Sequence, residues 1–379
     1  MGSQRTQAVR GLKLALVAAA ALALAACGGA KQSTPPLAVG AVDDAAKWAP
    51  DPGAQMQLAR ESGLSAVALS AVWQRGSSPA TDLPPLERAI AAAVAAHVQP
   101  VLDVYQLSSS TPLDATDRRA FASYAASLAR SLPAVHEVIV GNEPNLNLFW
   151  QPQFGPGGTD AAAPSYEALL AETYDALKAV DSKLTVVGGS LSPRGGDNAA
   201  AKRPTHSPTR FIADLGRAYR SSGRQLPLMD AFSLHVYGES PRIPPTLAHP
   251  RTTSIGLADY GKLVRLLGKA FDGTGQAGSK LPIVYGEYGV ETSVPAAKAG
   301  LYTGREVVAP VDPQVQARYY AEAVRLAACS PTVRMLLFFH VTDETRLEGL
   351  QSGLRYADGT PKPSVDAVRQ AERQGCPQG

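Results

Sequence analysis

Residues 98–140 read VQPVLDVYQLSSSTPLDATDRRAFASYAASLARSLPAVHEVIV and contain one unit of the pattern that decides the fold. Aliphatic runs over 98–105 and 135–140 predict two buried strands, because short runs rich in Val, Ile and Leu suit a sheet that is covered on both faces. Between them, apolar residues recur at helical spacing over 117–131. The stretch therefore predicts a strand, a helix and a second strand.

The same alternation continues through the rest of the chain. Six further aliphatic runs predict strands at 37–42, 64–69, 184–189, 231–237, 281–285 and 334–340. Alanine-rich segments with helical spacing predict helices at 85–96, 165–180, 257–270 and 312–328. Eight strands that alternate with helices predict a single α/β domain with a (β/α)8 TIM-barrel fold. An open doubly wound sheet is the alternative, but the Gly-rich nucleotide turn that often follows its first strand is absent from the sequence.

The chain begins with the layout of a secretory signal. Residues 1–26 carry Arg5, Arg10 and Lys13 and no acidic residue, and they end in an apolar run over 14–26. As a helix this run is ~20 Å long, too short for a bilayer core of about 30 Å. We therefore expect residues 1–26 to be a signal peptide for export.

The signal ends at 24–27 in Leu-Ala-Ala-Cys, which resembles the lipobox of bacterial lipoproteins. In that group the cysteine is lipidated and becomes the new N-terminus, so we expect Cys27 to anchor the chain to the membrane on its extracellular or periplasmic face. Residues 27–36 would then be the lipidated Cys27 and a flexible tether, and 37–379 the barrel. Cleavage near the same small residues, or an uncleaved anchor, are the alternatives.

Charge and cysteine content narrow the partners further. Removal of residues 1–26 takes away three positive charges from a formal net charge of +3, which leaves a neutral chain with no electrostatic reason to bind nucleic acid.

The two remaining cysteines, Cys329 and Cys376, predict a disulfide in an exported protein, with two buried free thiols as the alternative. No HExxH or CxxC motif is present, so the sequence predicts no metal site and no cofactor.

Almost every predicted strand ends in a polar or aromatic side chain, although its interior is apolar. These residues are Asp43, Asp44, Trp73, Asp103, Tyr105, Asn142, Glu143, Ser190, His235, Tyr237, Glu287, His340, Asp343 and Glu344. The carboxyl ends of barrel strands form the mouth where active sites lie. Asp103, Tyr105 and His340 are candidate substrate ligands there, while Asp343 and Glu344 are either ligands or loop charges.

Two of these strand ends carry a glutamate. The fourth predicted strand is followed by Gly-Asn-Glu-Pro at 141–144 and the seventh by Gly-Glu-Tyr-Gly at 286–289. Strands four and seven lie across the mouth of an eight-stranded barrel, so Glu143 and Glu287 are expected to face each other. Two carboxyl groups about 5 to 5.5 Å apart are what retaining cleavage of a glycosidic bond requires, one protonated to donate to the leaving oxygen and one ionised to attack.

The neighbours of the two glutamates fit the same chemistry. Asn142 is placed to hydrogen-bond the 2-hydroxyl of a sugar, an interaction that strengthens in the transition state. Tyr237 and His235 are candidates to hold the attacking carboxylate in position. Three aromatic residues are candidates for stacking on apolar sugar faces, namely Trp73, Trp150 and Tyr288. Trp48 is expected to serve packing instead.

Four motifs together resemble the clan A glycoside hydrolases, and most closely their families 39 and 5. They are GNEPN at 141–145, HVY at 235–237, PIVYGEYGVET at 282–292 and DGTPKP at 358–363. The resemblance spans 37–371. It implies a retaining mechanism with Glu143 as acid/base and Glu287 as nucleophile, and it favours Glu287 over Glu291 as the nucleophile.

We therefore expect an exported, membrane-anchored glycosidase that acts on a β-linked polysaccharide or oligosaccharide. The segment FFHV at 338–341 lacks the tryptophan that many clan members carry at the end of strand eight. This departure motivates the alternative of a carbohydrate-binding barrel lipoprotein without catalysis. An isomerase or aldolase barrel would want a lysine or a phosphate-binding loop after strands seven and eight, and neither is evident.

Overall fold

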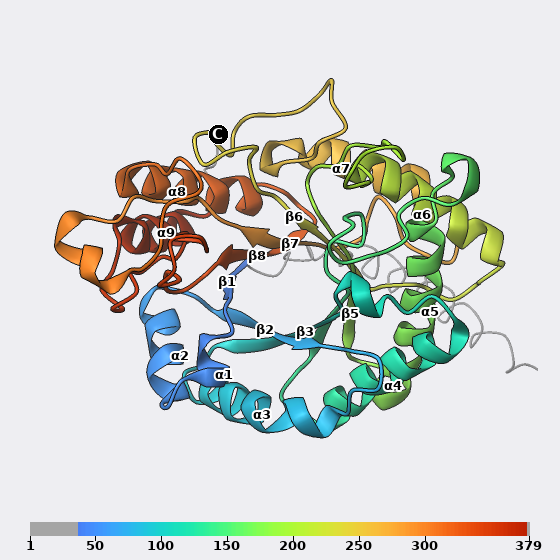
Figure 1. The fold of residues 1–379 in the computed structure, drawn as a ribbon, viewed down its shortest axis with the longest axis horizontal. Helices are drawn as coiled ribbons and strands as arrows, with labels where there is room; N and C mark the ends of the chain where they lie inside the picture. The colour runs from blue at the N-terminus through green and yellow to red at the C-terminus, as the bar shows by residue number, and fades with distance from the viewer. Residues whose placement is uncertain (1–36, 377–379) are drawn as a thin grey trace, which may run out of the picture. The chain divides into compact units, whose positions relative to one another are not determined.

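A computed structural model describes residues 37–376 as a closed barrel of parallel strands surrounded by helices (Figure 1). The strands are β1 (Ala38–Val42), β2 (Ala66–Val72), β3 (Gln99–Tyr105), β4 (Glu137–Val140), β5 (Thr185–Leu191), β6 (Ala231–His235), β7 (Ile283–Tyr288) and β8 (Val333–Phe339). Each strand pairs with the next in sequence, and β8 closes the barrel against β1. The predicted single-domain (β/α)8 barrel is confirmed. The predicted signal peptide, Cys27 and the tether lie outside the described residues.

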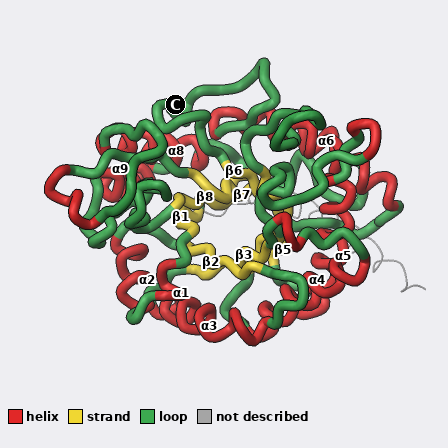
Figure 2. The backbone as a smooth tube through the Cα atoms, in the orientation of Figure 1, coloured by secondary structure: helices red, strands yellow, loops and turns green. Residues whose placement is uncertain are grey.

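Helices follow the strands and pack around the barrel, as Figure 2 shows in red. They are α1 (Ala45–Trp48), α2 (Pro52–Glu61), α3 (Pro79–Ala95), α4 (Ala115–Ser131), α5 (Ala162–Val180), α6 (Pro208–Ser222), α7 (Tyr260–Phe271), α8 (Pro313–Ala328) and α9 (Pro363–Gln374). Several begin with a side-chain cap and a proline in the first turn: Asp51, Ser207 and Asp312 each accept a backbone N–H of the helix that follows. Such caps satisfy amide groups that would otherwise lack a partner.

The apolar core has two layers, separated by the strands. Inside the barrel, a small cluster fills the part nearer the amino ends of the strands. Its members are Ala66, Ala68, Val101, Ile139, Val187, Ala231, Val284, Met335 and Leu337. Outside, the other faces of the strands pack against the helices in one large cluster. Both faces of each strand are therefore covered, which explains why the strands read as continuous apolar runs.

Element boundaries differ from the predicted ones by a few residues. The first helix after β2 begins at Pro79, six residues before the predicted 85, because Ser78 caps it there and Pro79 occupies its first turn. The predicted helix at 257–270 is a short 3-10 turn over Leu257–Asp259 followed by α7. Strand β7 extends to Tyr288, so Glu287 lies within the strand rather than after it.

Cys329 and Cys376 form a disulfide that joins the end of α8 to the segment after α9, with their Cα atoms 4.8 Å apart. The bond ties the last helix of the described chain to the barrel wall. None of the helices within residues 37–376 has the length and apolarity needed to span a membrane.

Candidate active site

The segment after β4 presents Glu143 through an unusual backbone. Gly141 has φ 83°, and a Cβ there would approach the ring of Tyr166 to 2.9 Å, so glycine is required. Glu143 itself has φ 39°, a conformation that costs energy for a residue with a side chain. Its N–H donates to the carbonyl oxygen of Ser190 at 2.8 Å, which holds the turn against β5. Strained residues of this kind cluster at functional sites.

Glu287 enters the same space from β7. Gly286 precedes it, and a Cβ at that position would overlap the side chain of Ser233 and crowd the ring of His235. The glycine thus lets β6 side chains approach β7. The hydroxyl of Tyr237 donates to Oε2 of Glu287 at 2.9 Å, and the Glu287 side chain is only 15% exposed. The predicted role of Tyr237 in holding this carboxylate matches that contact.

The ring of His235 lies between the two glutamates. Its Nδ1 is 3.0 Å from Oε1 of Glu143 and 3.4 Å from Oε2 of Glu287, and its Nε2 is 3.3 Å from the hydroxyl of Ser190. Burial lowers the pKa of His235, but the charge of Glu287 and the hydrogen bond with Glu143 outweigh it and raise the pKa to about 9. At neutral pH the site therefore holds an imidazolium between two carboxyl groups.

These contacts limit how far apart the two carboxyl groups are. The Oε1 of Glu143 and the Oε2 of Glu287 cannot be further apart than the two His235 distances laid end to end. Two carboxyl groups that contact one ring in this way are close enough to act on the same glycosidic bond. Burial, with the charge of Glu143, raises the pKa of Glu287, while the charge of His235 opposes the rise.

Three further strand-end residues point unpaired polar atoms into buried space. The Oδ1 of Asn142, the Oδ1 of Asp103 and the Nδ1 of His340 are buried and have no hydrogen-bond partner among the described residues. Burial raises the pKa of Asp103 well above its usual range, and the negative charge of Glu287 raises it further. Asp103 therefore lies close enough to Glu287, the candidate nucleophile, for their charges to interact. Unpaired buried polar atoms are costly, and sugar hydroxyls are suitable partners for them.

The aromatic residues expected to stack on sugars are not brought to the mouth. Trp73 is 1% exposed and packs edge-on against Phe121, with ring centroids 5.6 Å apart. Trp150 is fully buried, and its indole N–H donates to Ser165 at 2.9 Å. Tyr288 is 2% exposed and packs near Tyr320 on the outer side of the barrel, with ring centroids 5.6 Å apart. All three lie in the packing between strands and helices.

Trp48 departs from its predicted packing role. It is 72% exposed at the end of α1, the short helix that follows β1 on the mouth side. The ring of Phe339, at the end of β8, lies 6.4 Å from that of Tyr237 in an edge-on arrangement. At the end of strand eight, where the sequence has no tryptophan, Phe339 is therefore the aromatic residue beside the site.

Of the two loop carboxylates left open, neither joins the mouth. The side chain of Asp343 is fully buried and pairs with Lys362 at 2.7 Å, beneath the loops after β7 and β8. Glu344 is exposed and accepts the N–H of Leu350. Glu291 also lies in this network, where its Oε1 accepts the N–H of Gln351 at 2.8 Å. These residues hold loops together, and the choice of Glu287 over Glu291 is consistent with their placement.

Lys47, which the sequence pattern did not single out, joins the predicted strand-end residue Asp44 in a polar cluster at the ends of β1 and β2. The Nζ of Lys47 is buried, donates to the carbonyl oxygen of Ser70 at 2.6 Å and pairs with Asp44 at 3.0 Å. The charges of Lys47 and Asp44 both act on Asp103. A lysine five residues after the first strand, three and four residues beyond two aspartates, was the available signal.

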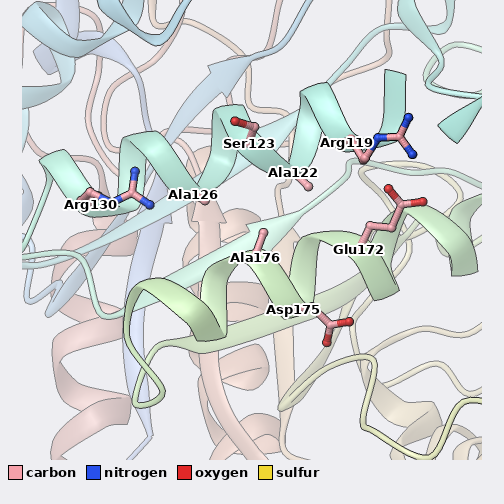
Figure 3. A pocket seen from close by; sticks show the side chains of 8 residues that line it. All are labelled: Arg119, Ala122, Ser123, Ala126, Arg130, Glu172, Asp175 and Ala176. Atoms are coloured by element: carbon pink, nitrogen blue, oxygen red, sulfur yellow. The ribbon is translucent and has the colours of Figure 1, made fainter. Parts of the chain in front are cut away.

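A groove on the outer wall of the barrel is separate from the site. It lies between α4 and α5 and forms where Ala122, Ala126 and Ala176 leave room between the helices (Figure 3). Arginines from α4 and carboxylates from α5 flank it. None of the strand-end residues lines this groove, and small side chains alone do not make a site, so we assign no function to it.

Comparison with known proteins shows likeness in structure only. No protein-family model matches the chain, and no curated protein matches its sequence. A GH39 β-xylosidase from Caulobacter crescentus matches with TM-score 0.55 and 18% identity, over 90% of this chain and 72% of that one. GH5_18 from Streptomyces cattleya, solved in complex with GlcNAc, matches with TM-score 0.57 and 16% identity, over 90% and 81%.

A glucosidase from Croceicoccus marinus also matches, with TM-score 0.59 and 12% identity, over 90% of this chain and 68% of that one. The structures that this chain is similar to are thus glycoside hydrolases, two of them from the families 39 and 5 that its motifs resemble. At such low identities the likeness shows that the chain shares their barrel fold.

Proposed function

We propose that this chain is a retaining glycoside hydrolase that cleaves β-linked O-glycosidic bonds, with Glu143 as acid/base and Glu287 as nucleophile. The contact of His235 with both carboxyl groups carries the proposal, because it brings glutamates from two distant strands together around one ring, as a carboxyl pair that acts on one glycosidic bond requires. The activities named for the similar structures give it further support.

In the proposed reaction, the carboxylate of Glu287 attacks the anomeric carbon while Glu143 gives its proton to the leaving oxygen. A covalent glycosyl-enzyme forms and the leaving group departs as an alcohol. Glu143, now ionised, takes a proton from water, and the resulting hydroxide equivalent displaces Glu287. Tyr237 and His235 stabilise the ionised form of Glu287 before the attack, which burial alone would disfavour.

The test is a panel of 4-nitrophenyl β-glycosides, followed by labelling with the 2-deoxy-2-fluoro analogue of the best substrate. We expect mass spectrometry to find the fluorosugar on Glu287, and we expect Glu143→Gln and Glu287→Gln each to lower kcat at least 1,000-fold. Hydrolysis that survives Glu287→Gln, or a label on another residue, would contradict the assignment. Sugar-dependent thermal stabilisation without products from any variant would favour the carbohydrate-binding alternative.

The export proposal rests on a separate observation. The signal layout of residues 1–26 and the Cys329–Cys376 disulfide both suit a compartment outside the cytoplasm. We propose that Cys27 carries a lipid that anchors the chain to the membrane. Cys27→Ser is expected to move the protein from the membrane fraction to the soluble fraction and to abolish incorporation of a labelled fatty acid; no change in either would contradict lipidation.

A further inference from the structure

The side of the mouth next to Glu143 carries few charges. Within the loops that follow β3 and β4, residues 106–113 and 144–159 contain no charged side chain, and the carboxylates of these loops, Asp114, Glu143 and Asp160, lie near the loop ends. The loops after β5, β6, β7 and β8 differ, because they carry exposed basic side chains. These are Lys202, Arg203, Arg242, Arg251, Arg305 and Arg346. Basic side chains of these mouth loops are therefore concentrated after β5 to β8, whereas Arg75 on the loop after β2 pairs with Asp117 and donates to the carbonyl oxygen of Thr111.

The loops after β3 and β4 are joined into one surface. The N–H of Ser108 donates to the carbonyl oxygen of Leu148 at 3.1 Å, and the side chain of Gln106 donates to that of Phe149 at 3.1 Å. A third bond runs from the N–H of Gln151 to the hydroxyl of Thr111 at 3.1 Å. The loops thus support each other without a partner molecule.

Among the polar side chains of this surface, such as the exposed Ser109 and Gln151, four aromatic and aliphatic side chains lead outward from the site. The ring of Tyr105, close enough to Glu287 for the charge of that glutamate to act on its hydroxyl, meets the ring of Phe149 edge-on at 6.1 Å. Further out, Leu107 is 45% exposed and Leu148 is 61% exposed. An apolar path therefore leads from the site to solvent over these four residues, which we name the apolar path.

The position of the apolar path relative to Glu143 indicates what it contacts. A general acid donates to the oxygen of the leaving group, so the leaving group departs on the side of that acid. Two members of the apolar path, Leu148 and Phe149, lie on the loop that carries Glu143, where the N–H of Leu146 donates to the carbonyl oxygen of Glu143 at 2.8 Å. The hydroxyls of a second sugar placed there would lose hydrogen bonds with water, and the side chains of Leu107 and Leu148 offer no hydrogen bonds in their place.

We infer that the leaving group of the substrate is apolar, so that the enzyme acts on alkyl or aryl glycosides rather than on polysaccharide chains. This inference rests on the proposed function and names its substrate class. The sugar that is cleaved lies over Asp103, Asn142 and His340, whose unpaired polar atoms suit its hydroxyls. The apolar aglycone lies along the apolar path.

The test compares three glycosides of the sugar that the protein hydrolyses best, with methyl, octyl and 2-phenylethyl aglycones, all below micelle-forming concentrations. The three leaving groups are simple alcohols, so the comparison reports mainly contact with the aglycone. We expect kcat/KM for the octyl or phenylethyl glycoside to exceed that for the methyl glycoside by about tenfold or more. Whichever of the octyl and phenylethyl glycosides has the larger kcat/KM shows whether the preferred aglycone is lipid-like or aromatic.

The variant Leu107→Ser/Leu148→Ser is expected to reduce this preference to about threefold or less, with little loss for the methyl glycoside. Leu247→Ser is the matched control, because Leu247 is 46% exposed on the loop after β6, and it should keep the full preference. Equal rates for all three aglycones, a higher rate for a disaccharide, or an unchanged preference in the double variant would overturn the inference and leave the hydrolase intact. No hydrolysis of any glycoside would overturn both.

Discussion

At the scale of single residues, the chemistry of the site depends on one histidine between two buried carboxyl groups. Two carboxylates at this separation repel each other, and without a cation one of them would hold a proton strongly. His235 supplies that cation through Nδ1, while Ser190 fixes the ring from the other side. The arrangement allows Glu287 to be ionised and Glu143 to stay close to it.

The variant His235→Asn is therefore expected to change the pH dependence of the reaction. Asn keeps a donor near the position of Nδ1 but removes the positive charge, so the pKa of Glu287 should rise. We expect the acidic limb of kcat/KM to move to higher pH by roughly one unit. His136→Asn, at an exposed position at the other end of the barrel, is the control and should leave the profile unchanged. An identical profile for both variants would exclude this role for His235.

Glu291 offers a prediction about stability instead of activity. Burial raises the pKa of this carboxyl to about 7, against 4.5 for the ordinary group, although a hydrogen bond from Gln351 opposes the rise. The folded protein therefore binds a proton that the unfolded chain releases between these pH values, and the contribution of Glu291 to stability falls as pH rises from about 4.5 to 7.

Glu291→Gln removes this proton dependence. Relative to the wild type, the variant should gain roughly 1–3 kcal/mol in the free energy of unfolding at pH 8, and little or nothing at pH 4.5. Urea unfolding at the two pH values measures the difference, which cancels the other titrating groups. A difference that is the same at both pH values would show that folding does not change the pKa of Glu291.

At the scale of strands and helices, the sequence was sufficient for the barrel because each buried strand is a continuous aliphatic run between turn residues. The same continuity hides which way each side chain points. Trp73 was expected at the mouth, yet it faces the helices. Tyr288 follows Glu287 directly, and because side chains alternate along a strand, it had to point away from the site if Glu287 points into it. Period-two alternation was thus the signal that would have excluded Tyr288.

Residues brought together from distant loops could not be predicted in the same way. Pairing Glu143 with Glu287 needed only the strand order of a barrel, but the contact of His235 with Glu143 depends on Gly286, which makes room for β6. The burial of Asp343 against Lys362 depends on how the loop after β8 folds back, and no periodic pattern specifies that path.

Opposite the mouth, an ion pair joins two strands across the bottom of the barrel. Glu137 at the start of β4 is 2% exposed and pairs with Arg334 near the start of β8. Glu137→Ala would leave the arginine without its buried partner, so we expect a loss of about 3 kcal/mol in the free energy of unfolding with kcat/KM unchanged. Glu87→Ala on exposed α3 should change stability by less than about 0.5 kcal/mol. A loss of activity in the Glu137 variant at full folding would contradict a purely structural role.

At the scale of the whole described chain, chemistry and stability occupy different parts of the barrel. The catalytic candidates and the long loops lie at the carboxyl ends of the strands, as in barrel enzymes generally. The bottom of the barrel holds the apolar inner cluster and the Glu137–Arg334 pair. The last helix is held by the disulfide, so the segment that completes the barrel wall is fixed covalently.

The disulfide links this architecture to the proposed compartment. Cys329 and Cys376 are 47 residues apart in sequence, and closing a loop of this length stabilises a fold by about 2–4 kcal/mol, chiefly by restricting the unfolded chain. Reduction of the wild type should lower the free energy of unfolding by this amount, and the variant Cys329→Ser/Cys376→Ser should show the same loss without any response to reductant. Because Cys329 lies at the end of α8, just before the start of β8 and thus on the side of the barrel opposite the mouth, kcat/KM of the folded variant should be unchanged. The contrary result would be that Cys329 and Cys376 of the exported protein react as two free thiols under denaturing conditions. The disulfide would then not form outside the cytoplasm, and it would no longer support export.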